Sequence, residues 1–325
     1  MKQLLAAIAV ATLAYSGWWF YAANSLSSDV ETWFDAQKAA GLEAQYSDIA
    51  VRGFPNRTDL TLTDPILVSA DGRFGWTAPF LQILALTYKQ GHVIVAWPDT
   101  QTLTSPDGDI AVTSDGMRAS MIYSDNTVLR TNVEATGLNL AGPRRTLALA
   151  DVNAALQRID PAPSTYRIAL SAGSLAVPSS EMVPSSAPGS LASFRAELDL
   201  GFDRPLTFDM FAQARPRPTA VELHRSEISY GSVTFKLTGA ATLDDQGRAT
   251  GEVSITAENW RDALVSARTS GELPPVLADG LADLLTLLAS LTGSRETLDV
   301  TLGLEKGTVL LGPLPVGTLP PLVWR

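Results

Sequence analysis

A run of twenty residues without a charged side chain, Leu4–Ala23, constrains this chain more than any other feature of its sequence. At ~1.5 Å of rise per residue, a helix over this run would be ~30 Å long, which is the hydrocarbon thickness of a bilayer. Lys2 precedes the run, and Asp29 and Glu31 follow it. The positive-inside bias then predicts a cytoplasmic N-terminus and a bulk outside the cytoplasm. We therefore expect residues 1–24 to form a single transmembrane anchor that contacts the membrane through residues 4–23.

Two details bear on this anchor. Residues 18–21 are four consecutive aromatic residues near the exit end, which is typical of a membrane–water interface. The alternative is a cleaved signal peptide, for which Ala14-Tyr15-Ser16 offers a small-x-small cleavage site. We favour the retained anchor because cleavage there would leave an exposed aromatic start.

After the anchor, apolar and polar residues alternate with a period of two. The alternation recurs at Leu60–Leu62, Ala196–Phe202, Val233–Leu237, Val253–Ile255 and Leu298–Leu304. Strands of this kind belong to antiparallel sheets with one dry and one wet face. Turn signals occur between the runs, at Asp71-Gly72, Asp107-Gly108, Asp115-Gly116 and Asp245-Gln246-Gly247. The sequence therefore predicts a mainly β (α+β) fold, a large curved antiparallel sheet with a few packed helices.

The expected helices are few. One begins at a Ser27 or Ser28 cap and ends at Gly41, and shorter ones cover Pro79–Ala85, Asp151–Arg158 and Glu258–Ala267. The longest covers Pro274–Thr292 and is amphipathic. Its apolar face carries Leu277, Leu281, Leu284, Leu285, Leu288 and Leu291.

The chain also suggests an internal organisation. We expect Val177–Ser193, rich in Ser and Pro, to be a linker or mobile loop. We expect two β-rich halves, 25–165 and 166–325, or one continuous domain. The stretches 90–150 and 195–260 share a hairpin texture that suggests an internal repeat.

Composition excludes several classes of function. The formal net charge is −10, so the chain would repel a nucleic-acid backbone. The absence of Cys excludes disulfides, thiolate metal sites and cysteine nucleophiles. Only His92 and His224 could supply imidazole, and each stands alone in an expected strand.

No motif for catalysis or cofactor binding stands out. The P-loop, the dinucleotide fingerprint, the nucleophile elbow and the zincin motif are all missing. Asp107, Asp109 and Asp115 fit turns better than a calcium loop. Arg144-Arg145 and Arg215–Pro218 are local basic spots that suit solvated loops or anionic headgroups. We therefore expect that the protein is not an enzyme and that it has no catalytic residue, cofactor or metal.

Several segments resemble a known bacterial family. They include Gly53-Phe54-Pro55-Asn56-Arg57, Ala78-Pro79-Phe80, Leu86-Thr87-Tyr88 and the closing Gly312-Pro313-Leu314-Pro315. Over nearly the whole chain they resemble the domain-of-unknown-function family 2125 of Gram-negative bacteria. That resemblance implies an inner-membrane and periplasmic setting and no assigned reaction.

A second resemblance is more local. The stretch from Leu237-Thr238-Gly239 to Gly251-Glu252-Val253 is similar to AsmA-like envelope proteins. That likeness implies a lipid-lined β groove and a role in phospholipid traffic or outer-membrane assembly.

Two functional hypotheses follow. In the first, an inner-membrane-anchored periplasmic protein binds lipid or another apolar ligand in a β-sheet groove and supports envelope biogenesis. The groove would be lined by the six leucines of the 274–292 helix. In the second, the protein is a non-catalytic assembly or scaffold partner of a membrane complex, which docks through a sheet edge or Pro-rich loops. A continuous apolar channel along the concave face favours the first, and a filled core with an exposed edge strand favours the second.

Overall fold

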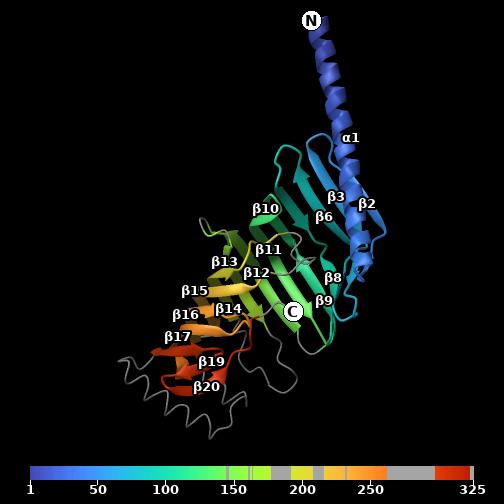
Figure 1. The fold of residues 1–325 in the computed structure, drawn as a ribbon. Helices are drawn as coiled ribbons and strands as arrows, with labels where there is room; N and C mark the ends of the chain where they lie inside the picture. The colour runs from blue at the N-terminus through green and yellow to red at the C-terminus, as the bar shows by residue number, and fades with distance from the viewer. Residues whose placement is uncertain are drawn as a thin grey trace. The chain divides into compact units, whose positions relative to one another are not determined.

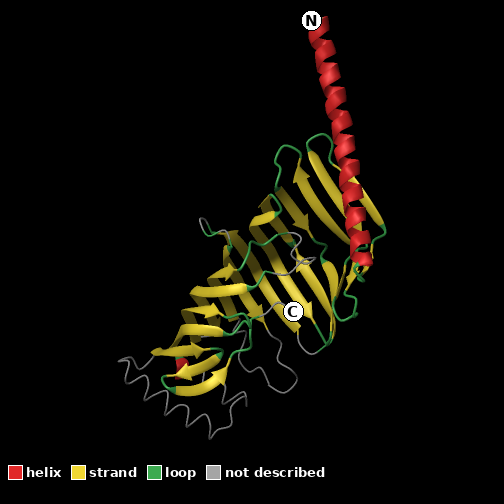
Figure 2. Cartoon of the chain, viewed as in Figure 1, coloured by secondary structure: helices red, strands yellow, loops and turns green. Residues whose placement is uncertain are grey.

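The computed structural model describes residues 1–325 apart from 144–145, 160–161, 163, 177–191, 208–215, 231–232, 262–296 and 323–325 (Figures 1 and 2). Strands make up most of it, and all the assigned strand pairs are antiparallel. This confirms the predicted mainly β fold. The chain divides into two compact units. Unit 1 comprises Met1–Ile122 and Val133–Ala148, and unit 2 comprises Tyr123–Asn132 and Leu149–Arg325.

Unit 1 begins with one long helix, α1 (Lys2–Ala39), of 38 residues. Its N-terminal half extends beyond the strands, and its C-terminal half lies along them (Figure 1). The helix is long and apolar enough to cross a membrane. The prediction of a separate helix capped at Ser27 or Ser28 is wrong. The helix is continuous through both serines, and Ser27 donates its hydroxyl back to the Ala23 carbonyl at 3.3 Å, as a serine inside a helix can.

The strands of unit 1 form two antiparallel series. In the first, the order of pairing is β2 (Asp48–Arg52), β3 (Arg57–Thr63), β6 (Phe80–Leu86), β7 (His92–Ala96) and β10 (Arg118–Ser124). In the second, it is β1 (Glu43–Gln45), β4 (Ile66–Val68), β5 (Gly75–Thr77), β8 (Thr100–Ser105), β9 (Gly108–Asp115) and β11 (Thr127–Ala141). Along the chain, consecutive strands therefore alternate between the two series, mostly two at a time: β2 and β3 belong to the first, β4 and β5 to the second, and so on.

The two series meet where the strands bend. Pro65, Pro79 and Pro98 lie at the breaks, and none can donate a ladder hydrogen bond. Backbone bonds still cross the bend, from the Asp64 amide to the Pro79 carbonyl (2.9 Å) and from the Ala78 amide to the Pro65 carbonyl (3.3 Å). The strands thus end at the bend, but backbone hydrogen bonds still join neighbouring segments across it.

Two sequence predictions fail at this bend. The expected helix over Pro79–Ala85 is strand β6, because β3 and β7 both pair with it and their ladders decide its conformation. Asp115-Gly116 is a bend between β9 and β10 and not a hairpin turn, since β9 pairs with β8 and β10 pairs with β7.

A small core joins α1 to the first strand series. Phe34, only 2% exposed, packs with Leu60 and Leu62 of β3, and Leu26 and Val30 add to the same cluster. The predicted alternation of Leu60 and Leu62 therefore turns these side chains toward the helix.

Unit 2 is an antiparallel meander in which each strand pairs with the next. Its strands are β13 (Thr165–Ala176), β14 (Ala192–Phe202), β15 (Pro218–Tyr230), β16 (Val233–Leu243), β17 (Ala249–Glu258), β18 (Thr297–Glu305), β19 (Thr308–Leu311) and β20 (Leu314–Thr318). The strand β12 (Thr146–Arg158) contributes residues to both units. It replaces the helix predicted over Asp151–Arg158, which is therefore wrong.

Other predictions fall partly outside the described residues. Glu258 ends β17, and only residues 260–261 of the predicted Glu258–Ala267 helix are described as helical. The 274–292 helix lies wholly outside the described residues. So does most of the predicted linker, although Ala192 and Ser193 belong to β14.

The glycines of the β16–β17 hairpin mark a close approach of two backbones. A Cβ at Gly251 would lie 2.1 Å from the Ala240 carbonyl oxygen, and one at Gly239 would lie 2.3 Å from the Glu252 carbonyl oxygen. Any larger residue would force the two strands apart.

We expect Gly251→Ala to lower the free energy of unfolding by about 1–3 kcal/mol, the usual cost of overpacking. The matched control is Gly317→Ala in β20, where nothing lies within 4 Å of the added Cβ. Urea unfolding of the full chain in mild detergent would measure both. Equal stabilities of the two variants would contradict the close approach.

Candidate functional site

One face of the unit 2 sheet is apolar across six strands, β13 to β18. Cross-strand partners set its rows, and residues two apart on a strand share the face. One row is Ile168, Leu198, Leu223, Gly239, Val253 and Leu302; the next is Leu170, Ala196, Ser226, Leu237, Ile255 and Val300; the third is Ala172, Phe194, Ile228, Phe235, Ala257 and Leu298. We call these three rows the apolar face. The predicted alternation in β14, β16, β17 and β18 is confirmed by them.

The apolar face is covered only in part. Near its β17–β18 end, Trp260 packs with Ala257 and Leu298, and all three are buried. On β13, β15 and β16, in contrast, Leu170 is 37% exposed, Ile228 40% and Phe235 36%. Large apolar side chains that stay exposed on one surface mark a place where another apolar surface can bind.

The opposite face of the same sheet is polar and paired. Lys236 lies 2.5 Å from Glu258, and Thr256 donates its hydroxyl to Asp299 at 2.6 Å. Arg225 pairs with Glu227 at 3.1 Å. The sheet of unit 2 is thus amphipathic, with a wet side and a largely apolar side.

A cluster on the polar face brings together charged residues far apart in sequence. Arg167 donates two hydrogen bonds to Asp199, of 2.8 and 2.9 Å. His224 Nε2 lies 2.8 Å from Asp199 Oδ2, the oxygen that also accepts one of the Arg167 bonds, and its Nδ1 lies 3.7 Å from Glu222. A β-bulge produces this geometry. Leu198 pairs with Leu223 but Glu197 pairs with Arg225, so His224 is the extra residue that the bulge turns toward Asp199.

Charge and hydrogen bonding define the chemistry of this cluster. The guanidinium of Arg167 holds the pKa of the Asp199 carboxyl below its ordinary value of 3.8, against the opposing effect of burial. Donor atoms of Asp199, Glu222 and His224 lie within 4.8 Å of one another, close enough to consider a metal ion. Arg167 already occupies both oxygens of Asp199, so a cation would have to displace it. The arrangement therefore suits an ion-pair network better than a metal centre.

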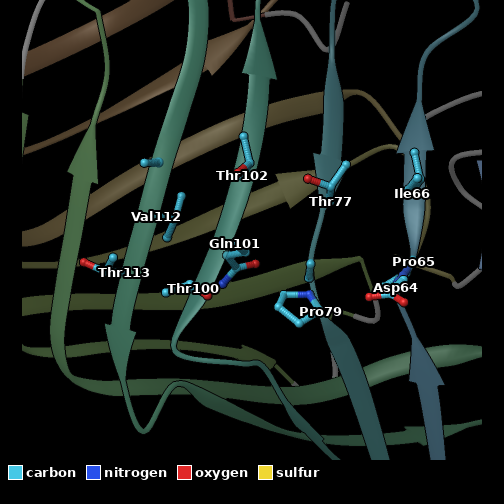
Figure 3. Close-up of a pocket in the computed structure, with 12 residues that line it drawn as sticks. Asp64, Pro65, Ile66, Thr77, Pro79, Thr100, Gln101, Thr102, Val112 and Thr113 are labelled. Atoms are coloured by element: carbon cyan, nitrogen blue, oxygen red, sulfur yellow. The ribbon is translucent and has the colours of Figure 1, made fainter.

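Unit 1 contains a separate groove of about 510 Å³ along the strand bend (Figure 3). Its lining mixes threonine hydroxyls with small apolar groups: Thr77, Thr100, Thr102, Thr113, Pro65, Ile66, Ala78, Pro79, Ala111 and Val112, with Asp64 and Gln101. Gln101 accepts a hydrogen bond from the Trp76 indole at 2.7 Å, which fixes its amide. The volume suits a small ligand, but the mixed lining does not provide a continuous apolar surface.

The residues singled out from the sequence differ in whether the structure describes them and in what they contact. The groove-lining leucines, Leu277, Leu281, Leu284, Leu285, Leu288 and Leu291, lie outside the described residues. His92 contacts Ser120 at 3.0 Å across β7 and β10. Arg217 pairs with Asp203 and Asp245, each at 3.3 Å, so it serves the protein's own acids. Arg144, Arg145 and Arg215 are not among the described residues.

The sequence model of the family described as "Uncharacterized protein conserved in bacteria (DUF2125)" matches residues 19–320. The chain belongs to this family. The comparisons with curated proteins and with solved structures found no match. The DUF2125 match begins at Trp19, a residue 3% exposed that donates its indole N–H to the Arg57 carbonyl at 2.8 Å. The likeness of the β16–β17 hairpin to AsmA-like proteins stays a prediction.

A pH-dependent contribution to stability follows from the Asp199 cluster. Because the folded-state pKa of Asp199 lies below its unfolded value, the ion pair stabilises the fold fully above about pH 4. That contribution is lost as the pH falls through the folded pKa. We expect Asp199→Asn to cost about 1 kcal/mol at pH 7, since Arg167 is half exposed, and progressively less below pH 4.

Asp245→Asn is the control, because Asp245 is 92% exposed in its own ion pair with Arg217. It should leave stability nearly unchanged at both pH values. Urea unfolding at neutral and acidic pH tests the pair. A cost for Asp199→Asn that persists undiminished in acid would contradict the assignment.

Proposed function

We propose that this protein is anchored in the bacterial inner membrane by α1 and binds lipid or another apolar ligand with the apolar face of unit 2. In this proposal the bulk of the chain lies in the periplasm, and the bound ligand serves envelope biogenesis. The observation that carries the proposal is the apolar face itself. It runs over six strands and retains three large side chains that are more than a third exposed.

Energetics favour an acyl chain as the occupant. Burial of an apolar chain contributes about 0.8 kcal/mol per CH₂ group and needs no polar partner. Ile228 and Phe235 are cross-strand partners on β15 and β16, and Phe194 of β14 continues the same row, so an extended chain could follow branched and aromatic side chains across neighbouring strands. The polar face cannot serve in this way because its charged groups already pair with one another.

Topology is tested by two fusions to the full chain. Because Lys2 precedes the apolar run and acids follow it, alkaline phosphatase at the C-terminus should be active and the same enzyme at the N-terminus inactive. Sequencing of the purified protein should start at Met1. A start at Gly17 would replace the anchor with a cleaved signal peptide.

Ligand binding is tested by photo-crosslinking in cells. A benzophenone amino acid at Ile228 or Phe235 should form lipid adducts, detected by mass spectrometry of the purified full chain. Thr238 is the matched control, because it is exposed on the polar face of the same strand as Phe235. Adducts should be several-fold more abundant at Phe235 than at Thr238. Equal labelling at both positions, or no lipid adduct at either apolar position, would overturn lipid binding.

One observation favours a second candidate function, that of an assembly or scaffold partner. Every residue of β20 is exposed, including Leu314 at 64% and Val316 at 55%, and among the described strands β20 pairs only with β19. An open strand edge of this kind can pair with another chain. If crosslinks at Val316 capture protein while Phe235 captures no lipid, this function takes the place of lipid binding.

A further inference from the structure

We propose that unit 1 rests on the membrane surface through its β2–β3 turn (Gly53–Asn56) and its β6–β7 turn (Thr87–Gly91), in addition to the anchor. This inference rests on the proposed membrane anchoring and identifies the surface of the folded unit that meets lipid. We call the two turns the membrane-facing turns. The proposed partner is the interfacial layer of the bilayer that α1 crosses.

The membrane-facing turns are bound to α1 at Tyr15, within its apolar run. Tyr15 donates its hydroxyl to the Pro55 carbonyl at 2.6 Å and lies 3.3 Å from the Thr87 hydroxyl. The two turns are also joined to each other, since the Thr87 amide donates to the Asn56 carbonyl at 3.0 Å. Whatever depth Tyr15 occupies, both turns therefore occupy nearly the same depth.

Aromatic packing strengthens this attachment. Trp19 makes an edge contact with Phe54, with ring centroids 5.6 Å apart, and Phe20 stacks on Phe54 at 5.9 Å. Trp19 is buried in the contact, and Ala23 is only 8% exposed. Residues 19–23 thus pack against protein at two positions and cannot be surrounded by lipid on all sides.

This packing changes where the membrane must end. If all of Leu4–Ala23 lay in hydrocarbon, Tyr15 and the polar turn residues Asn56 and Lys89 would lie ~12 Å inside it, given ~1.5 Å of rise per residue. Lipid-exposed, non-helical turns and the charged Lys89 side chain are strongly unfavourable at that depth. The lipid-exposed segment therefore ends near Trp18. Lys2–Trp18 is still ~25 Å long, close to the shortest span that crosses a bilayer.

The composition of the turns suits the interface. Phe54 is 47% exposed and Tyr88 is 74% exposed, although both are large aromatic side chains. Trp18, Phe20 and Tyr21 are exposed on α1 at the same level. Aromatic residues collect at the membrane–water boundary. Arg52 and Lys89 are both exposed and place positive charge beside these aromatic residues, although the whole chain has a net charge of −10. This local positive charge favours contact with anionic headgroups.

The test uses the absence of native cysteine, so each introduced Cys carries the only label. Full-length Tyr88→Cys, Phe74→Cys and Leu13→Cys are labelled with bimane and reconstituted in vesicles of phosphatidylcholine and phosphatidylglycerol. Phe74 is the matched control, because it is also an exposed turn phenylalanine (57%). It lies in the β4–β5 turn beside the C-terminal end of α1, where Gly41 approaches Ala70. Leu13 reports on the span itself.

Lipids that carry a nitroxide near the headgroup should quench the label at 88 strongly, at the depth of about 5–10 Å typical of interfacial residues. They should leave the label at 74 unquenched, while aqueous iodide should show the reverse order. Lipids that carry the nitroxide along the acyl chain report on position 13. Quenching at 13 by these lipids, with no headgroup quenching at 88, would overturn this proposal and leave the anchor intact. No acyl-chain quenching at 13 would overturn the anchor and, with it, this proposal.

Because Tyr88 is exposed, its replacement should not disturb folding, and Lys89→Cys provides a second label in the same turn. Labels at 88 and 89 that are both as accessible to iodide as the label at 74 would contradict contact between the turn and the bilayer.

Discussion

Hydrogen bonding between neighbouring strands fixes the face that each side chain occupies, and most of this structure depends on that constraint. In unit 2 the ladders from β13 to β18 align apolar residues into three rows and charged residues into the rows opposite. A shift of one residue in any ladder would exchange the two faces of that strand. The single-residue bulge at His224 does this locally in β15, and it keeps Leu223, Ser226 and Ile228 on the same side.

The same alternation explains how much could be predicted. Ala196, Leu198 and Leu200 are separated by charged residues, so both the strand and its apolar side followed from the sequence. The bulge leaves only a weak signal in the sequence, a slip in the alternation between Leu223 and Ile228. The meeting of Arg167, Asp199 and His224 could not be predicted, because it depends on the register among three strands and the sequence states no register.

Helices were predicted less well, for a related reason. Residues 79–85 and 151–158 have local patterns that fit either a short helix or a strand. In the structure both have strand neighbours, and ladder bonds outweigh helix propensity over so few residues. The continuity of α1 through Ser27 and Ser28 has a different cause. Phe34 and Trp19 contact the strands of unit 1 at two levels of α1, and one continuous helix can make both contacts.

The contact between α1 and the strands of unit 1 bears on how far α1 can enter a membrane, and the start of the family match agrees with it. A flexible linker after the span would leave unit 1 free to turn above the bilayer, and the aromatic residues after Ser16 would serve only as an interface belt. Here Trp19 is buried and bonded to Arg57, and the family match starts at this residue. The latter part of the apolar run is therefore part of the folded unit. If α1 crosses the bilayer as proposed above, this continuous helix links the orientation of the unit 1 strands to that of the membrane, because a helix bends little without proline or an inserted group.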